Sequence, residues 1–332
     1  MHCFNLRSSA LVLISALCAM LSFVAYGQYT FAVVGKTKND SFYEQSFKGC
    51  QDFAQRQADL RCIYDGAYDY QDARTQALVV QDLVAQGVDG ILVSTTDSQH
   101  LVNRALKKAQ EQGIAVITFD SDLAPQHQTY RLAYVGTNNF DFGVALGEAA
   151  KQFKREHPQT LCIQSGHHTT PNLNKRIDGV RYALSGSTKR LNGESGWLEH
   201  PRCPLFTAGR RDDALKQLRT IISYPQPTIF VAVAGFAQFN PDYQQVMTEF
   251  KQQLAKKQRV IISADTETLQ LQALASGLGT MNIGQNPYEM GRKGAQLLYD
   301  AVKHQHLPEQ EQYYLPFHYC TPDNAQSCAK NH

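Results

Sequence analysis

Apolar and polar positions follow two different rhythms from residue 29 onward. Short Val/Ile-rich runs without strict alternation, such as those at 29–35 and 60–66, predict parallel strands that are buried on both faces. Longer segments with apolar residues at helical spacing lie between them, as at 41–57. Strands that alternate with helices in this way predict an α/β fold with a doubly wound parallel sheet.

The same alternation continues along most of the chain and forms two successive series of similar size. No Pro- or Ser-rich linker separates the two series, and 189–206 fits neither pattern clearly. We expect further strands at 89–95, 115–120, 160–166, 228–235, 259–265 and 280–284, and further helices at 72–88, 98–114, 141–158, 174–186, 212–225, 242–256 and 287–305.

The first 27 residues have a different pattern from the rest of the chain. Arg7 precedes an apolar stretch from Ala10 to about Val24, and Ala25 and Gly27 are small residues ahead of Gln28. This arrangement predicts a secretory signal peptide over 1–27, cleaved before Gln28, and therefore export to the periplasm. A single membrane anchor is the alternative interpretation.

Export changes the interpretation of the cysteines. Two of the eight lie in the predicted signal peptide, and an even number in an oxidising compartment suggests disulfides. Zinc is the competing use, but no C-x-x-C or clustered His/Cys spacing occurs, and the adjacent His167 and His168 cannot easily bind one metal ion. Neighbours in sequence suggest the pairs Cys50–Cys62, Cys162–Cys203 and Cys320–Cys328.

Polar residues follow the predicted strands in both series. Two sheets whose strand ends face each other would form a cleft lined by carboxylates, amides and aromatic rings. Such a lining suits a polyhydroxylated ligand, because carboxylates and amides bind hydroxyls and ring faces cover the C–H faces of a sugar. These strand ends are 36–40, 95–97, Asp120, 165–174, Gly235 and Phe236, Asp265 and Thr266, and Gln285.

Other function classes find little support. Gly35-Lys36-Thr37 looks like part of a phosphate-binding loop, but the glycine that this loop needs is replaced by Thr30. No G-x-S-x-G or G-x-G-x-x-G motif occurs, and no pair of carboxylates is specified by spacing, so we expect neither an enzyme nor a cofactor. The net charge of +2 gives no general attraction to nucleic acid.

Several stretches together carry a family resemblance over nearly all of 29–318. They are NDSFYEQSFKGC, QDLVAQGVDGILVS, AVITFDSD, YVGTNNFDFGVALGE, NLNKRIDGV and ISADTETLQLQALASGLGTMNIGQNPYEMG. In this order and spacing the chain resembles periplasmic sugar-binding proteins of the ribose-binding type, whose fold is the type I periplasmic binding protein fold.

The resemblance implies two lobes joined by a three-segment hinge that closes on the ligand. The crossovers would fall near Gly136, Gln285 and Leu315. The first lobe would then comprise 28–136 plus 286–315, and the second 137–285 plus 316–332. The third crossover would return the tail, with Cys320 and Cys328, to the second lobe.

The resemblance also implies ligand-binding residues. Phe42 and Tyr43 match an aromatic pair that stacks on the sugar, and Asp120 matches a carboxylate that binds its hydroxyls. Ser121 and Asn174 stand where the ribose type has arginines, and two charged residues replace uncharged ones, which argues against ribose itself. The ligand-binding residues that we predict are Lys36, Asp40, Phe42, Tyr43, Asp120, Asn174, Arg176, Phe236, Asp265 and Gln285.

Several of these residues have structural alternatives. Asp265 could cap a helix, Asp120 could cap a helix or form an Asx-turn, and Lys36 could be a solvated loop tip. Gln285 could act only in the hinge, and Arg176 could form a structural ion pair with a helix-side carboxylate.

The sequence thus predicts a monomeric periplasmic protein that captures a sugar, polyol or sugar acid and delivers it to the membrane permease of an ABC transporter. The alternative partner is the periplasmic domain of a chemoreceptor or sensor kinase. A secreted hydrolase and a repressor effector domain are less well supported.

Overall fold

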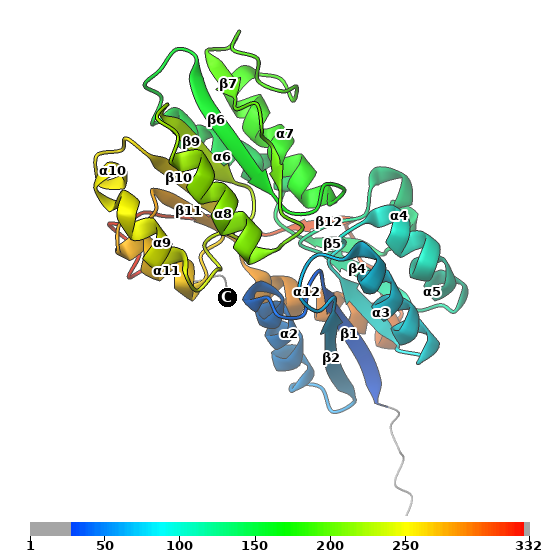
Figure 1. Ribbon diagram of the computed structural model, residues 1–332. Coiled ribbons are helices and arrows are strands. Elements are labelled where there is room, and N and C mark those ends of the chain that lie inside the picture. Colours follow the sequence, from blue (N-terminus) through cyan, green and yellow to red (C-terminus); the bar gives the residue numbers. More distant parts are fainter. Residues whose placement is uncertain (1–27, 329–332) are drawn as a thin grey trace, which may run out of the picture.

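A computed structural model describes residues 28–328, so the predicted signal peptide at 1–27 lies outside the described residues. The part of the chain that it describes folds into two lobes, each a mainly parallel sheet with helices on both faces (Figure 1). The predicted α/β class with two doubly wound lobes is therefore confirmed. No helix within 28–328 has the length and apolar character needed to cross a membrane.

The first lobe contains a six-stranded sheet with the order β12-β5-β4-β3-β1-β2. Helices α2 and α12 pack together on one face of this sheet, and α3 to α5 lie on the other (Figure 1). Its elements are β1 (Tyr29–Gly35), α2 (Ser41–Ala54), β2 (Leu60–Gly66), α3 (Ala73–Ala85), β3 (Gly90–Val93), α4 (Ser98–Leu101), the π-helix η2 (Val102–Leu106), α5 (Lys107–Glu111), β4 (Ala115–Phe119), the 3-10 helix η3 (Pro125–Tyr130), β5 (Ala133–Gly136), α12 (Pro287–His304) and β12 (Gln312–Tyr314).

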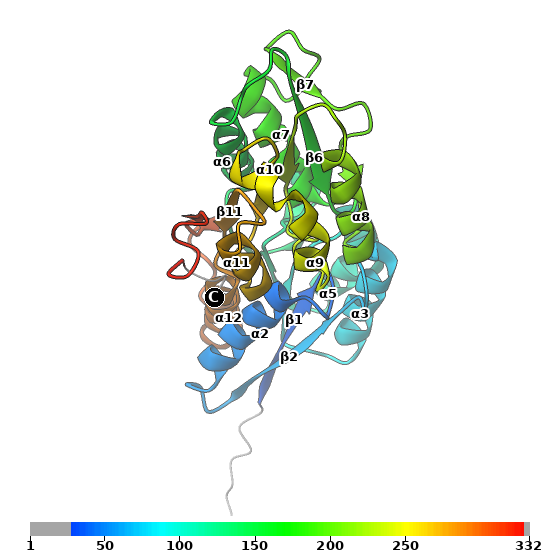
Figure 2. The ribbon, with the colours of Figure 1, turned by 60° about the vertical axis from the view of Figure 1, so that its left-hand side comes forward.

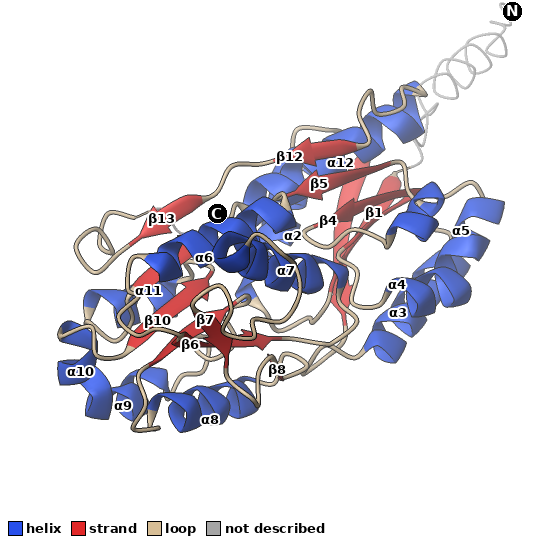
Figure 3. Ribbon diagram, turned by 90° about the horizontal axis from the view of Figure 1, so that it is seen from above, coloured by secondary structure: helices blue, strands red, loops and turns tan. Residues whose placement is uncertain are grey.

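The second lobe contains the sheet β13-β11-β10-β9-β6-β7, with β8 also pairing with β6. Helices α6 and α7 cover one face, and α8 to α10 cover the other, as the turned views in Figures 2 and 3 show. Its elements are α6 (Asn139–Lys151), β6 (Gln159–Ser165), α7 (Pro171–Ser185), β7 (Trp197–Glu199), β8 (Leu205–Phe206), α8 (Arg211–Ile222), β9 (Thr228–Ala232), α9 (Tyr243–Met247), the 3-10 helix η4 (Thr248–Phe250), α10 (Lys251–Ala255), β10 (Val260–Ala264), α11 (Thr268–Ala275), β11 (Met281–Gly284) and β13 (His318–Cys320).

Strand β1 shows why these strands carry continuous apolar runs. Phe31 and Val33 point into the core beneath α2 and α12, whereas Ala32 and Val34 point into the core beneath α3. All four are almost fully buried. Because both faces of the strand are covered, no position in its centre can be polar without losing apolar burial worth about 25 cal/mol per Å².

Helix α12 connects the end of the second series back to the first lobe. It crosses α2 at very short range, since a Cβ at Gly291 would overlap the backbone of Ser46, and one at Gly49 would overlap that of Tyr288. This close approach requires glycine at both crossing points. The chain then adds β12 to the first sheet and β13 to the second, so it passes between the lobes a third time.

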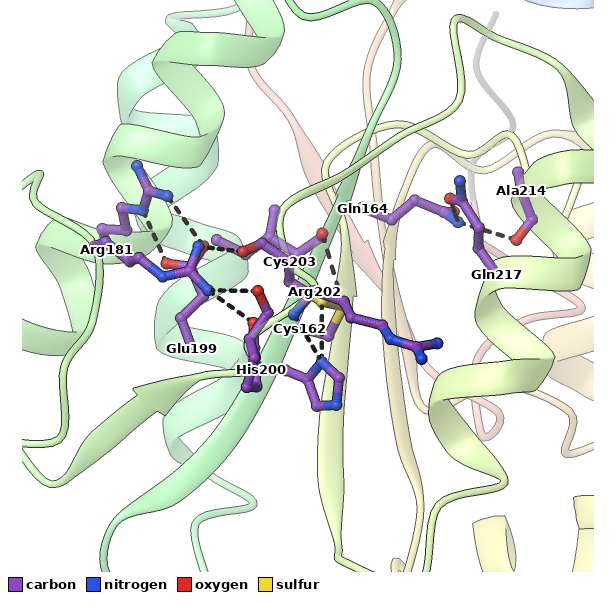
Figure 4. The surroundings of a disulfide bond; sticks show 12 residues. Cys162, Gln164, Arg181, Glu199, His200, Arg202, Cys203, Ala214 and Gln217 are labelled. Atoms are coloured by element: carbon purple, nitrogen blue, oxygen red, sulfur yellow. Dashed lines mark hydrogen bonds and ion pairs between the residues drawn. A yellow bond between two sulfur atoms is a disulfide. The ribbon is translucent and has the colours of Figure 1, made fainter.

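The three disulfides suggested by the sequence are present: Cys50–Cys62, Cys162–Cys203 and Cys320–Cys328. The first joins α2 to β2, and the third joins the tail to β13. Figure 4 shows the second beside Glu199, a buried carboxylate that Arg181 holds through two hydrogen bonds.

Candidate functional site

A cavity lies between the lobes, where the carboxyl ends of the strands of both sheets meet. Its enclosed volume is about 30 Å³, and all the space free of protein atoms, open solvent at its mouth included, amounts to about 330 Å³. Its walls come from both lobes and combine ionisable, amide and aromatic side chains. The lining residues are Lys36, Asp40, Phe42, Tyr43, Gln71, Asp120, Asn172, Leu173, Arg176, Ala234, Phe236, Phe239, Asp265 and Gln285.

Nine of the ten ligand-binding residues predicted from the sequence line this cavity, and Asn174 does not. Asn174 lies on α7 two positions from Asn172, which puts it about 200° away around the helix. Its side-chain amide instead donates a hydrogen bond to the backbone carbonyl of His168. We therefore withdraw Asn174 from the candidate site and replace it with Asn172.

The sequence reasoning missed five lining residues: Gln71, Asn172, Leu173, Ala234 and Phe239. Helical spacing could have found Asn172, since it precedes Arg176 by four positions on the same face of α7. Gln71 lies in the loop before α3 and reaches across the cleft, where its side-chain carbonyl accepts from the backbone N–H of His167. No pattern in the sequence marks that contact.

Asp120 and Asp265 occupy equivalent places in the two lobes. Each directly follows a central strand, β4 or β10, and each has a left-handed backbone, with φ of 55° and 73°. Non-glycine residues adopt this region rarely, and Asp and Asn tolerate it best. Asp265 does not cap α11, whose N-cap is Glu267, so the capping alternative for Asp265 is wrong.

Asp120 is the centre of a network that joins the lobes. Its Oδ2 accepts from Lys36 Nζ at 2.9 Å, Tyr43 OH at 3.1 Å and Ser94 Oγ at 2.7 Å, all within the first lobe. Its Oδ1 accepts from Asn172 Nδ2 of the second lobe at 3.0 Å, and Arg176 Nη2 lies 3.6 Å away. Neither an Asx-turn nor a cap describes this arrangement.

Lys36 is buried beside Asp120 and is not a solvated loop tip, with 2% of its surface exposed. Its ammonium also donates to Asn172 Oδ1 across the cleft, at 3.0 Å. Burial lowers the pKa of Lys36, although Asp120 opposes this. Burial alone would raise the pKa of Asp120, but Lys36 and Arg176 more than offset it and hold that pKa below its usual value. Both groups are therefore held as a buried ion pair.

Arg176 has most of its donors occupied by the protein. Its Nε donates to Asn139 Oδ1, Nη1 to the carbonyl of Val233, and Nη2 to Gln285 Oε1, at 2.8, 3.0 and 2.8 Å. The guanidinium also lies 4.5 Å over the ring of Phe142. This geometry favours a structural role for Arg176. The carboxylate of its ion pair, however, is Asp120 at the end of a strand and not one on a helix.

Asp40 and Asp265 face the cavity from opposite lobes and are engaged differently from Asp120. Asp40 Oδ1 accepts from Phe42 N at 3.0 Å and caps α2, and Asp265 Oδ1 accepts from Gln285 Nε2 at 2.8 Å. Neither takes part in an ion pair among the residues from 28 to 328. Burial raises the pKa of Asp40 to about 6 and also raises that of Asp265.

Aromatic rings complete the walls on both sides. Phe42 and Tyr43 meet edge to face at 5.3 Å in the first lobe, and Phe236 and Phe239 do so at 6.4 Å in the second. Phe42 and Tyr43 also both belong to the hydrophobic core of the first lobe, so the same two rings pack in the core and line the cavity.

Further contacts join the lobes around the mouth of the cavity. Gln71 N donates to the carbonyl of Ala208 at 2.7 Å, and Arg211 Nη2 donates to that of Asn39, also at 2.7 Å. The guanidinium of Arg210 lies 4.2 Å over the ring of Tyr70. The structure therefore presents the lobes in contact over the cavity.

Across the described part of the chain, one group of potential metal ligands comes together outside this cavity. His318, Cys320 and Cys328 place their ligand atoms within 4.8 Å of one another. The two sulfurs form a disulfide, so this group offers no thiolate to a metal ion.

Comparisons with known proteins agree with this architecture. The family model for the periplasmic binding protein domain matches residues 31–306. The ribose import binding protein of Bacillus subtilis is 30% identical over 218 residues, which cover 63% of this chain and 70% of that protein. The D-ribose/D-allose-binding protein of Pseudomonas aeruginosa is 27% identical over 165 residues, 48% of this chain, so the match spans 51% of that relative's length.

Among solved structures, an ABC transporter solute-binding protein from Burkholderia graminis in complex with D-arabinose has a TM-score of 0.75 to this chain. The match covers 92% of this chain and 99% of the other, at 23% sequence identity. At this identity the likeness concerns the fold.

Proposed function

This chain belongs to the periplasmic binding protein domain family, and on that premise we propose that it is a solute-binding protein. It captures one small polar molecule, a sugar or sugar derivative, in the cavity between its lobes. The observation that carries this proposal is the lining of that cavity, where ionisable, amide and aromatic side chains converge from both sheets. A concave site of this composition fits a hydroxylated ligand with apolar C–H faces.

Binding is coupled to closure because the ligand contacts belong to both lobes. Asp40 and Phe42 approach from the first lobe, and Asp265 and Phe236 from the second. A ligand that bridges them binds the closed form more tightly than the open form and shifts the population toward closure. The family and the relatives named above support binding and transport in place of catalysis.

We further propose that the closed, loaded protein acts in the periplasm and delivers its ligand to the permease of an ABC transporter. The import function named for the Bacillus subtilis relative supports this role. A strain that lacks this chain should then fail to take up the ligand. If uptake is normal and a chemotactic or transcriptional response to the ligand is lost, the partner of this protein is a chemoreceptor or sensor kinase and not a transporter.

A thermal-shift screen tests the binding function. The protein without residues 1–27 is heated with sugars, polyols, sugar acids and amino sugars, one at a time. A compound at 100 times its Kd stabilises the folded protein by about 2.7 kcal/mol, which raises the Tm measurably. If no compound raises the Tm, or if the protein converts the compound that does so, the proposal fails.

A further inference from the structure

The charges of the cavity do not balance. Two cations, Lys36 and Arg176, line it together with three carboxylates, Asp40, Asp120 and Asp265. Both cations lie against Asp120, at 2.9 and 3.6 Å, and the protein's ion pairs within the described ranges include neither of the other two carboxylates. With all three carboxylates ionised, the groups that line the cleft carry one net negative charge.

Asp120 has little capacity left for a ligand. A carboxylate offers about four lone-pair sites, and four donors already bond to Asp120, three at Oδ2 and one at Oδ1, where Arg176 Nη2 also lies 3.6 Å away. Three of these donors, Lys36, Tyr43 and Ser94, belong to the first lobe, and the fourth is Asn172. Asp120 thus holds the two lobes together. The carboxylates that can bind a ligand are therefore Asp40 and Asp265.

Asp40 and Asp265 keep acceptor capacity on the cavity side. Asp40 accepts one hydrogen bond, at Oδ1, and Asp265 accepts one at Oδ1 from Gln285 and one from the backbone N–H of Gly235, which leaves each carboxylate at least one further acceptor site. Both residues are at least 94% buried. Rings from both lobes lie in the same walls. Buried carboxylates and aromatic faces both stabilise an organic cation, the first by charge and the second through the ring quadrupole.

We propose that the ligand is a hydroxylated amine, an amino sugar or an amino polyol, whose ammonium group binds between Asp40 and Asp265. This inference rests on the proposed function, because it names the ligand class of that same site. A monocation neutralises the charge left over in the cleft, whereas a sugar acid adds a second negative charge to it. Lys36 and Arg176 form their ion pairs with Asp120, so neither of them already neutralises Asp40 or Asp265 through an ion pair.

The surrounding groups also set how binding depends on pH. Burial raises the pKa of Asp40 to about 6, with Arg211 acting against the increase, and burial likewise raises the pKa of Asp265, with Arg176 opposing it. The affinity for an amine should therefore rise as the pH increases through about 6 and Asp40 ionises. The charged and titratable groups near the two carboxylates are Lys36, Tyr43, Tyr64, Asp120, Arg176 and Arg211.

Matched pairs of probes test the inference by calorimetry at about pH 7. D-glucosamine is compared with D-glucose, D-galactosamine with D-galactose, and D-glucamine with D-glucitol, so that each pair differs in one amino group. We expect the amine to bind at least tenfold more tightly than its neutral partner in one pair or more. This advantage should fall at least tenfold in Asp40→Asn and Asp265→Asn, and in the wild type at about pH 5.

Asn keeps both the cap at residue 40 and the left-handed backbone at residue 265, so these variants remove charge with little change of shape. Asp52→Asn is the matched control, because Asp52 lies on α2 outside the cavity and accepts from Tyr288 OH. Its affinity should equal that of the wild type. If the neutral compound of every pair binds as tightly as the amine, the inference is wrong, but the proposed function is still supported. If the pairs fail and the wider screen also finds no ligand, the proposed function itself fails.

Discussion

Asp265→Asn separates ligand recognition from folding more cleanly than any other single change in the cavity. Asp265 is 5% exposed, its backbone has a φ of 73°, and its carboxylate accepts from the side-chain amide of Gln285 at 2.8 Å and from the backbone N–H of Gly235. An alanine would strain this backbone, whereas Asn tolerates it and can keep the contact with Gln285. The substitution therefore removes the negative charge and preserves the local structure.

The expected loss follows from the type of contact. A hydrogen bond from a ligand to a charged, buried carboxylate contributes about 1.5–3 kcal/mol. The Kd of the best ligand from the thermal-shift screen should therefore rise by about 10- to 150-fold in Asp265→Asn. Calorimetric titration of the wild type, Asp265→Asn and the control Asp52→Asn measures this difference.

The ligand-free protein provides the second readout. Burial raises the pKa of Asp265, so its charge opposes folding above the usual pKa of an aspartate. The Tm of ligand-free Asp265→Asn should then equal or exceed that of the wild type at pH 7. A variant with normal affinity would refute the role of Asp265 in the site, and a lower Tm would refute the assigned burial of its charge.

Four further substitutions test the site and its surroundings. Asn172→Ala should weaken ligand binding and closure, whereas Asn174→Ala should leave the Kd unchanged, as titration of both variants will show. Lys36→Met leaves the buried Asp120 without its ammonium and should lower the free energy of unfolding by about 3–5 kcal/mol in urea, with Asp52→Asn as the reference. Because the pKa of Asp40 is raised in the folded protein, its ionisation lowers the free energy of unfolding as the pH rises from about 4 to about 6. Asp40→Asn removes this loss, so the variant should become more stable than the wild type over that interval, by at most about 3 kcal/mol.

The sequence predicted the strands well because burial on both faces leaves a strong local signal. The expected bounds 29–35 and 60–66 coincide with β1 and β2. The helix expected at 98–114 is instead divided into α4, the π-helix η2 and α5. No residue there marks the change of hydrogen bonding, so local patterns could not reveal it. The short strands β7 and β8 lie in the segment for which the pattern was unclear.

The site was predictable where it depends on strand ends and not where it depends on contacts between lobes. Asp120 and Asp265 follow their strands directly, so the pattern alone placed them at the cleft. The environment of Lys36 depends on Asp120 and Asn172, which are 84 and 136 positions away in the sequence. Likewise, the choice between Asn172 and Asn174 depends on which face of α7 points to the cavity, and the family resemblance did not show this.

The proposed lobe boundaries, 28–136 plus 286–315 and 137–285 plus 316–332, remain a prediction about which segments move together. Thr137 and Gln285 belong to different crossovers, and Thr137 Oγ1 donates to Gln285 Oε1 at 2.9 Å. Coupling two hinge segments in this way should make them move as a unit on closure.

A crystal structure of the protein with its tightest ligand tests the central claim most directly. We predict electron density for the ligand in the cavity between the two sheets, with its polar groups within hydrogen-bond distance of Asp40 and Asp265 and its apolar face against Phe42 or Phe236. Density for the ligand on the outer surface of either lobe, or a filled cavity in which neither carboxylate contacts the ligand, would contradict the account.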